Sequence, residues 1–310
     1  MSPIRAWWSP AYTAELGDHV MPIRKFQLVR DAVVAEGLPV SFAAPEPVTD
    51  ADLLWVHTAD YVRAVATGEP RAMAESQKFP WSPGLAASVR HTAGGCVAAI
   101  RSALADGVAA NVASGFHHAH ADHGEGFCTF NGLVVGLEAV RLDRPGLRAL
   151  IVDLDLHYGN GTAALLETRP WAHQVSVYGN GYRANQAFRD VSTFRAPPDT
   201  ANAVSVAVPG GADGAAYLDA VIGAVEPAFD RARPDVVLYQ AGADPYREDP
   251  YSPLELGHAD LRARDRWVLD ACRRRGVPVA WVLAGGYTTD VSKVVEVHLN
   301  TFRAAVELFT

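Results

Sequence analysis

Nearly continuous apolar runs recur along the chain, each bounded by glycine, proline or aspartate. They are rich in valine, isoleucine and leucine, and they cover 147–155, 173–179, 202–211, 234–242 and 277–286. Runs of this kind are typical of strands that are buried on both faces of a parallel sheet. The pattern therefore predicts a parallel sheet.

Stretches in which apolar residues recur at helical spacing lie between or beside these strands. They cover 24–37, 85–107, 214–233, 259–276 and 291–309. Strands that alternate with helices predict an α/β fold, with helices on both faces of the sheet. Because we find no linker, low-complexity run or internal repeat, we expect a single domain over 1–310. Ligands of such folds bind at the C-terminal ends of the strands, so we expect the active site there.

Two aspartates and a histidine alternate at the end of one predicted strand, in "VDLDLHYGNG". Burying carboxylates such as Asp153 and Asp155 is costly unless an opposite charge compensates them. A second predicted strand ends in Asp244 in the same way. Two carboxylates and the imidazole of His157, from two strand ends, predict a divalent-metal site with open positions. Zn(II), Fe(II) and Mn(II) suit these ligands, and we favour Zn(II).

A histidine-rich stretch, "SGFHHAHADHGEGFCTFNG", contains four imidazoles among small residues. The adjacent pair His117 and His118 is flanked by glycine and suits two imidazoles held near a reactive water. We assign no role to His120 and His123, which we expect to be turn or exposed residues. Tyr287 follows two glycines at a strand end, where its hydroxyl can reach into a site.

The composition of the chain argues against several classes of protein. The chain has 310 residues, of which 49% are hydrophobic, and a formal net charge of -8. An acidic chain is a poor nucleic-acid binder, so we expect no nucleic-acid partner. No apolar run approaches a membrane span, and the start lacks the layout of a signal peptide. Three cysteines without CxxC spacing indicate reduced thiols and a cytoplasmic location.

Taken together, these segments resemble a known family. "GFHHAHADHGEGFCTFN", "VDLDLHYGNGT", "QAGADPYREDP" and "LAGGY" are similar to the four motif regions of zinc-dependent histone deacetylases and their bacterial relatives, in the arginase/deacetylase superfamily. The resemblance spans nearly the whole chain, and "VPGGADGAAYLDA" is most similar to the class IV branch. It implies a hydrolase that removes an acyl group from an amine, first of all from Nε-acyl-lysine in a peptide and otherwise from a small N-acylated amine. An oligomer is compatible with this resemblance.

The family's metal and catalytic roles fall on matching positions. The resemblance makes Asp155, His157 and Asp244 the zinc ligands, with Fe(II) as an alternative ion in vivo. Tyr287 would donate a hydrogen bond to the substrate carbonyl. A structural K+ would be held at Asp153 and near backbone carbonyls that include Ser176 and Val177.

The tandem histidines would each have a partner. The resemblance makes His118 the general base and acid, and gives His117 an electrostatic role. Asp153 would hydrogen-bond His117, and Asn160 would orient His118. Many family members have aspartate at the position of Asn160, and an amide stabilises the charged form of the ring less strongly.

The resemblance also implies a tunnel for the acyl-lysine. Phe127 would line it, next to Gly126, with Tyr182 on the opposite wall, and Gly285 would lie beside the site in "LAGGY". Tyr251 occupies the position at which polyamine-specific relatives tend to have a glutamate. The loop "QKFPWSPG" lacks the aspartate that many deacetylases use to hold the substrate backbone, and Gly132 replaces an aspartate common in relatives.

Three alternatives remain beside the lysine deacylase. A binuclear manganese ureohydrolase of the arginase type needs further bridging aspartates, which "LHYGNG" and "PYREDP" do not provide. An acetylpolyamine deacetylase is disfavoured by the neutral Tyr251, which cannot pair with a second ammonium group. A non-catalytic acyl-lysine binder is disfavoured because the metal ligands, both tandem histidines and Tyr287 are all present.

Overall fold

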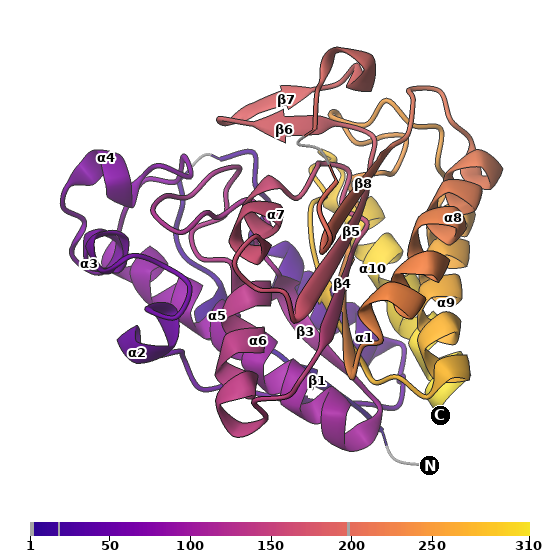
Figure 1. The fold of residues 1–310 in the computed structure, drawn as a ribbon, viewed down its shortest axis with the longest axis horizontal. Coiled ribbons are helices and arrows are strands. Elements are labelled where there is room, and N and C mark those ends of the chain that lie inside the picture. Colours follow the sequence, from indigo (N-terminus) through magenta and orange to yellow (C-terminus); the bar gives the residue numbers. More distant parts are fainter. Residues whose placement is uncertain (1–2, 18, 197–198) are drawn as a thin grey trace.

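One parallel sheet forms the centre of the protein (Figure 1). The computed structural model describes residues 3–17, 19–196 and 199–310. Within these residues the sheet has eight strands in the order β2-β1-β3-β10-β9-β4-β5-β8, and every neighbouring pair is parallel. The strands are β1 Ile4–Trp7, β2 Val40–Ala43, β3 Val108–Ser114, β4 Ala149–Asp153, β5 Ala172–Tyr178, β8 Ala203–Ala207, β9 Val236–Ala241 and β10 Val279–Leu283.

Helices cover both faces of this sheet (Figure 1). On one face α5 packs against α6, and on the other α1, α10, α9 and α8 pack side by side in that order. The helices are α1 Lys25–Ala35, α2 Asp50–Leu53, α3 Ala59–Thr67, α4 Arg71–Ala74, α5 Pro83–Asp106, α6 Gly132–Asp143, α7 Asn160–Leu166, α8 Gly214–Ala232, α9 His258–Arg275 and α10 Val291–Phe309. The predicted α/β architecture, a parallel sheet with helices on both faces, is confirmed.

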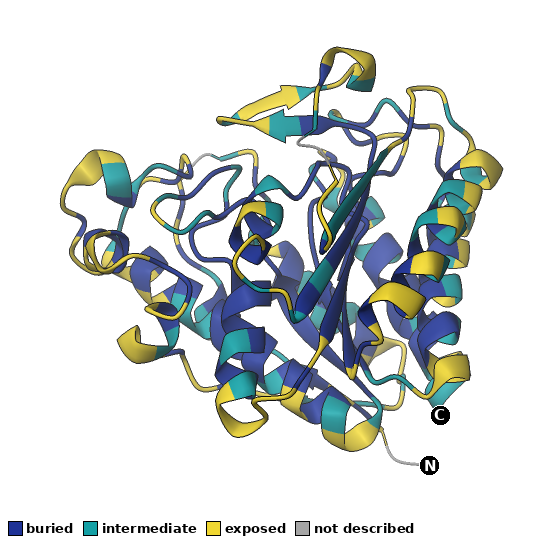
Figure 2. Cartoon of the chain, viewed as in Figure 1, coloured by how far each residue is buried: buried dark blue, intermediate teal, exposed yellow. Residues whose placement is uncertain are grey.

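The central strands consist mainly of apolar residues because both of their faces are buried. All residues of β3, β4, β9 and β10 are buried, whereas the edge strand β8 is only partly covered. Figure 2 shows the same gradient, with buried strands at the centre and exposed residues on the outer faces of the helices. Among the described helices, none is long and apolar enough to cross a membrane.

Strand β10 joins two halves of the sheet. It pairs with β3 on one side and with β9 on the other. The strands β2, β1 and β3 lie on one side of it, and β9, β4, β5 and β8 lie on the other. The four central strands β3, β10, β9 and β4 are therefore direct neighbours, and their C-terminal ends meet at one edge of the sheet.

A small antiparallel hairpin stands above this edge (Figure 1). It consists of β6 Gly181–Arg183 and β7 Gln186–Phe188. The hairpin follows β5 directly and brings Tyr182 over the ends of the central strands. This placement makes it one wall of the cavity described below.

Candidate metal centre and active site

Three metal-ligating side chains converge at the ends of β4 and β9. Asp155 and His157 follow β4, and Asp244 follows β9. One ligand atom from each lies within 4.8 Å of the others, and all three residues are buried. His157 Nδ1 lies 3.3 Å from Asp155 Oδ1 and 3.2 Å from Asp244 Oδ2. The structure thus brings together the three residues that the sequence predicts as metal ligands.

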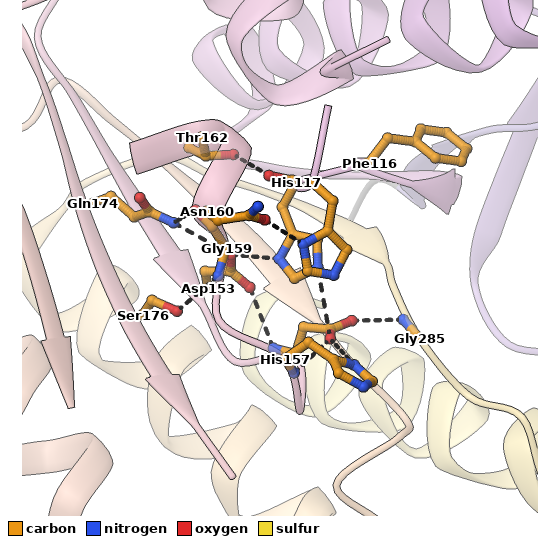
Figure 3. A network of polar contacts seen from close by, with 12 residues as sticks. Phe116, His117, Asp153, His157, Gly159, Asn160, Thr162, Gln174, Ser176 and Gly285 are labelled. Carbon is orange, nitrogen blue, oxygen red and sulfur yellow. Dashed lines mark hydrogen bonds and ion pairs between the residues drawn. The ribbon is translucent and has the colours of Figure 1, made fainter. Parts of the chain in front are cut away.

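Backbone amides hold the two carboxylates in place. The N–H of Gly285 (Figure 3) donates to Asp155 Oδ2 at 2.8 Å. The N–H of Leu156 donates to Asp244 Oδ1 at 3.0 Å. A side chain at 285 is excluded, because a Cβ there would lie 1.9 Å from Asp244 Oδ2. The glycine that the sequence places beside the site therefore leaves room for the Asp244 carboxylate.

The electrostatics of this cluster favour a cation. Burial raises the pKa of Asp244, and the neighbouring Asp155 carboxylate raises it further. Burial lowers the pKa of His157, but hydrogen bonds to both carboxylates outweigh this effect and raise the pKa to about 10. Two buried carboxylates thus attract one positive charge to the place where their oxygens converge. Two carboxylate oxygens and an imidazole are a donor set that fits Zn(II).

The tandem histidines follow β3, next to this cluster, and each has a partner on the β4 side (Figure 3). His117 Nδ1 lies 2.8 Å from Asp153 Oδ2, and His118 Nδ1 lies 2.6 Å from Asn160 Oδ1. The centroids of the two imidazoles are 4.0 Å apart. Both predicted pairs of partners are therefore in hydrogen-bond contact.

The pKa values of the two imidazoles are shifted in opposite directions. Burial lowers the pKa of His117, but Asp153 and Asp155 outweigh it, so the pKa is raised. Burial lowers the pKa of His118 well below its ordinary value, and the neighbouring His117 and His157 lower it further. The surroundings thus favour the protonated form more at His117 than at His118.

The residues expected around K+ lie on adjacent strands. Asp153 at the end of β4 is in register with Ser176 of β5, and Val177 follows in the same buried strand. The Asp153 carboxylate also accepts from the backbone N–H of Asp155 at 3.3 Å. The K+ site itself stays a prediction.

An aromatic cavity of about 230 Å³ opens over the candidate metal centre. The ring of Tyr182 stacks on His118 with centroids 4.0 Å apart, and Tyr251 meets Tyr287 edge-on at 5.2 Å. Of the described residues, none that lines this cavity is acidic; the lining consists of His118, Gly126, Phe127, His157, Tyr182, Asn185, Ala187, Tyr251 and Tyr287. Burial raises the pKa of Tyr287 well above its ordinary value, so its hydroxyl keeps its proton.

Comparison with known proteins decides the family. The model of the histone deacetylase domain matches residues 19–302 of the chain. The chain belongs to the histone deacetylase family.

Several relatives support this assignment. The histone deacetylase-like amidohydrolase of Pseudomonas aeruginosa is 30% identical over 294 residues, which are 92% of this chain and 76% of that protein. An uncharacterized protein of Picosynechococcus sp. is 30% identical over 306 residues, 97% of this chain and 98% of that protein. The crystal structure of the HDA15 HD domain has a TM-score of 0.81 at 21% identity, covering 99% of this chain and 90% of that one, and it shows the fold alone.

Two charged residues of this histone deacetylase domain were not predicted from the sequence. Lys25 of α1 is fully buried, and its Nζ donates to the carbonyl of Ala284 at 2.6 Å. Burial lowers the pKa of Lys25 to about 8, although Asp244 attracts the charged form. The buried Asp249 accepts from the backbone N–H groups of Tyr287 and Tyr251, at 2.7 and 3.0 Å. A lysine among the buried positions of α1 was a detectable signal, whereas "YREDP" gave none for Asp249.

The remaining histidines of the motif lie on the far side of Asn160. His120, His123 and Glu125 have ligand atoms within 4.8 Å of one another. However, the two rings are stacked with planes only 8° from parallel, so their lone pairs do not converge on one point. Asn160 Nδ2 already lies 3.1 Å from His120 Nε2 and 2.8 Å from Glu125 Oε2. We assign no metal to this group.

Proposed function

We propose that the chain is a zinc-dependent deacylase of Nε-acyl-lysine. The observation that supports this most strongly is the convergence of three ligand residues, two partnered histidines and Tyr287 at one end of an aromatic cavity. Membership of the histone deacetylase family supports a hydrolase that acts on acylated amines. Asp155, His157 and Asp244 would hold the zinc ion, and Asp153, Ser176 and Val177 would contribute to a K+ site behind it.

The proposed chemistry divides among residues of this chain. Zinc, when bound, would act as a Lewis acid that polarises the acyl carbonyl and makes water more acidic. His118, as a neutral imidazole, would accept a proton from the attacking water, while His117, paired with Asp153, would stabilise the negative charge that develops. Tyr287 donates its hydroxyl proton in a hydrogen bond to the carbonyl oxygen. His118 then returns the proton to the departing amine, and a carboxylate and a free amine leave.

The cavity supports an acyl-lysine over a cationic polyamine. Its walls are aromatic and its described lining contains no carboxylate. The nearby Asp249 is buried and already bonded to two backbone amides. Aromatic walls accept an alkyl chain well but give no ion pair to a second ammonium group. The uncharged Tyr251 at this cavity is consistent with that preference.

The ligand geometry also supports a single metal ion. In the part of the chain that the structure describes, the ligand group at this strand edge contains Asp155, His157 and Asp244 only. An arginase-type binuclear centre needs additional carboxylates that bridge two ions. We therefore propose a mononuclear site, in a protein whose buried free cysteines suit the reducing cytoplasm: Cys96, Cys128 and Cys272.

A substrate panel tests the proposal. The purified protein is loaded with zinc, its metal content is measured by plasma spectrometry, and it is assayed on lysine peptides with acyl groups from acetyl to long-chain fatty acyl. Acetylspermidine and acetylputrescine are included, and Tyr287→Phe serves as the matched control. Turnover of acyl-lysine that the control lacks supports the proposal. One bound zinc without turnover on any substrate would instead indicate a non-catalytic binder, and preference for acetylpolyamines would contradict the substrate class.

A further inference from the structure

The partner of His118 is itself held by two further side chains. Asn160 begins α7, and its side-chain oxygen lies 2.6 Å from His118 Nδ1 (Figure 3). On its other side, Asn160 Nδ2 lies 2.8 Å from Glu125 Oε2 and 3.1 Å from His120 Nε2. One amide therefore links the imidazole of the candidate site to a carboxylate outside it.

This link determines which way the amide faces. An asparagine side chain presents an acceptor on one side and donors on the other, and its two orientations have nearly the same shape. The carboxylate of Glu125 can only accept, so the NH₂ group must face Glu125. The oxygen of Asn160 then faces His118, and it can only accept.

The direction of the amide in turn selects the tautomer of His118. Because Asn160 Oδ1 accepts, the Nδ1 atom of a neutral His118 must carry the proton. Its Nε2 atom is then left with a free lone pair, which a base needs. A reversed amide would donate to Nδ1 and would require the proton on Nε2, where it blocks proton uptake.

Glu125 is suited to this position because it stays ionised. It is 6% exposed, and His123 Nε2 lies 3.4 Å from its Oε1 atom. His123 Nδ1 lies 2.7 Å from Asp122 Oδ1. Burial raises the pKa of Glu125, but hydrogen bonds from His123 and Asn160 outweigh it and lower the pKa below its ordinary value.

We propose that Glu125 is a positioning residue for His118, acting through Asn160: its carboxylate orients the amide and thereby keeps His118 in the tautomer that is a base at Nε2. The inference rests on the proposed function for its kinetic consequence, but not for the tautomer itself. It also gives a role to the segment between the tandem histidines and "GFC", in which His120 and His123 support the same amide and carboxylate.

A charge exchange between positions 125 and 160 tests the coupling. Glu125→Gln should lower kcat on the order of 10-fold with KM changed less than about 2-fold, because glutamine accepts or donates and no longer selects one amide direction. Asn160→Asp should also lose activity, since two carboxylates would then face each other across a 2.8 Å contact. The double variant should recover most of the activity, because the introduced glutamine donates to an introduced aspartate, which in turn accepts from His118. Recovery by a second substitution is not expected from two independent structural defects.

Glu167→Gln is the matched control. Glu167 lines the same cavity of about 280 Å³ as Glu125 and Asn160, is exposed, and has no contact with Asn160. Glu167→Gln removes one negative charge, as Glu125→Gln does, and should leave kcat unchanged. The proposal would be overturned if the fold-loss in kcat of the double variant equalled the product of the two single losses. Equal losses of kcat in Glu125→Gln and Glu167→Gln would overturn it as well.

A readout other than activity separates this inference from the proposed function. Nitrogen chemical shifts of labelled histidine distinguish the two tautomers of a neutral imidazole. With His118 assigned by comparison with His118→Gln, the zinc-loaded wild type should show the proton on Nδ1, and Glu125→Gln should show a mixture. An unchanged tautomer in Glu125→Gln would overturn the inference even in an active enzyme. The shift in tautomer would support it even if no acyl substrate were found.

Discussion

Replacing Gly285 by alanine should damage the metal centre without touching any ligand residue. An added Cβ would lie 1.9 Å from Asp244 Oδ2, whereas ordinary contacts begin near 3.4 Å. The carboxylate or the backbone must therefore move by about 1.5 Å, the difference between those two distances. The same residue donates its N–H to Asp155 Oδ2, so its movement disturbs a second ligand.

The expected loss of zinc affinity follows from how little displacement of its ligand atoms a metal site tolerates. Ligand distances are held to about 0.2 Å, and loss of a supporting contact costs about 10- to 100-fold in metal affinity. With two of three ligands affected, we expect zinc affinity to fall by more than about 100-fold, the upper end of that range. Activity at limiting zinc should fall in parallel, and added zinc should restore only part of it.

Zinc competition against a chromophoric chelator measures this affinity. Gly223→Ala is the matched control, because Gly223 lies on the exposed face of α8 and a Cβ there meets nothing within 4 Å. Alanine in a helix should be neutral or stabilise the protein by about 0.5–1 kcal/mol. If Gly285→Ala bound zinc as tightly as Gly223→Ala, the metal would not lie between Asp155 and Asp244.

The proposed roles give three further predictions. Asp244→Ala should lose both bound zinc and activity, as measured by plasma spectrometry and peptide assay; a variant that keeps stoichiometric zinc would show the ligand set to be wrong. Tyr287→Phe should bind zinc normally and lose about 100- to 1000-fold in kcat, as removal of one oxyanion donor does, and a near wild-type rate would make Tyr287 a wall residue only. Tyr251→Glu should raise the kcat/KM ratio of acetylspermidine to acetyl-lysine in competition assays, because it adds an ion pair; an unchanged ratio would place Tyr251 away from the distal amine.

The central strands were predictable because burial on both faces leaves an unmistakable pattern. The runs over 147–155, 234–242 and 277–286 became β4, β9 and β10. The short strands β1 and β2 were missed because four residues with alternating burial carry little periodic signal. β3 was missed although all of it is buried, since Asn111 interrupts its apolar run. That amide is satisfied only in the folded protein, where the hydroxyl of Tyr12 donates to it at 2.7 Å.

In the candidate site, too, some features were predictable from local sequence and others were not. Asp155 and His157 stand two residues apart directly after β4, so local spacing alone brings them together. Glu125 and Asn160 lie 35 positions apart in the chain, and their contact at 2.8 Å exists only because α7 packs beside the histidine loop. Asp249 likewise supports Tyr287 across 38 positions. Contacts of this kind depend on tertiary structure, and no local pattern predicts them.

The position of β10 in the sheet affects how the protein folds during translation. It is the last strand to leave the ribosome, yet it occupies the middle of the sheet. Until it arrives, β3 and β9 each present a bare apolar edge, and unpaired edges of this kind are prone to pair with other chains. The nascent protein therefore passes through a stage with two incomplete half-sheets. It acquires Gly285 and Tyr287, which follow β10, in the same step that closes that gap, so completion of the sheet and completion of the candidate site depend on the same segment.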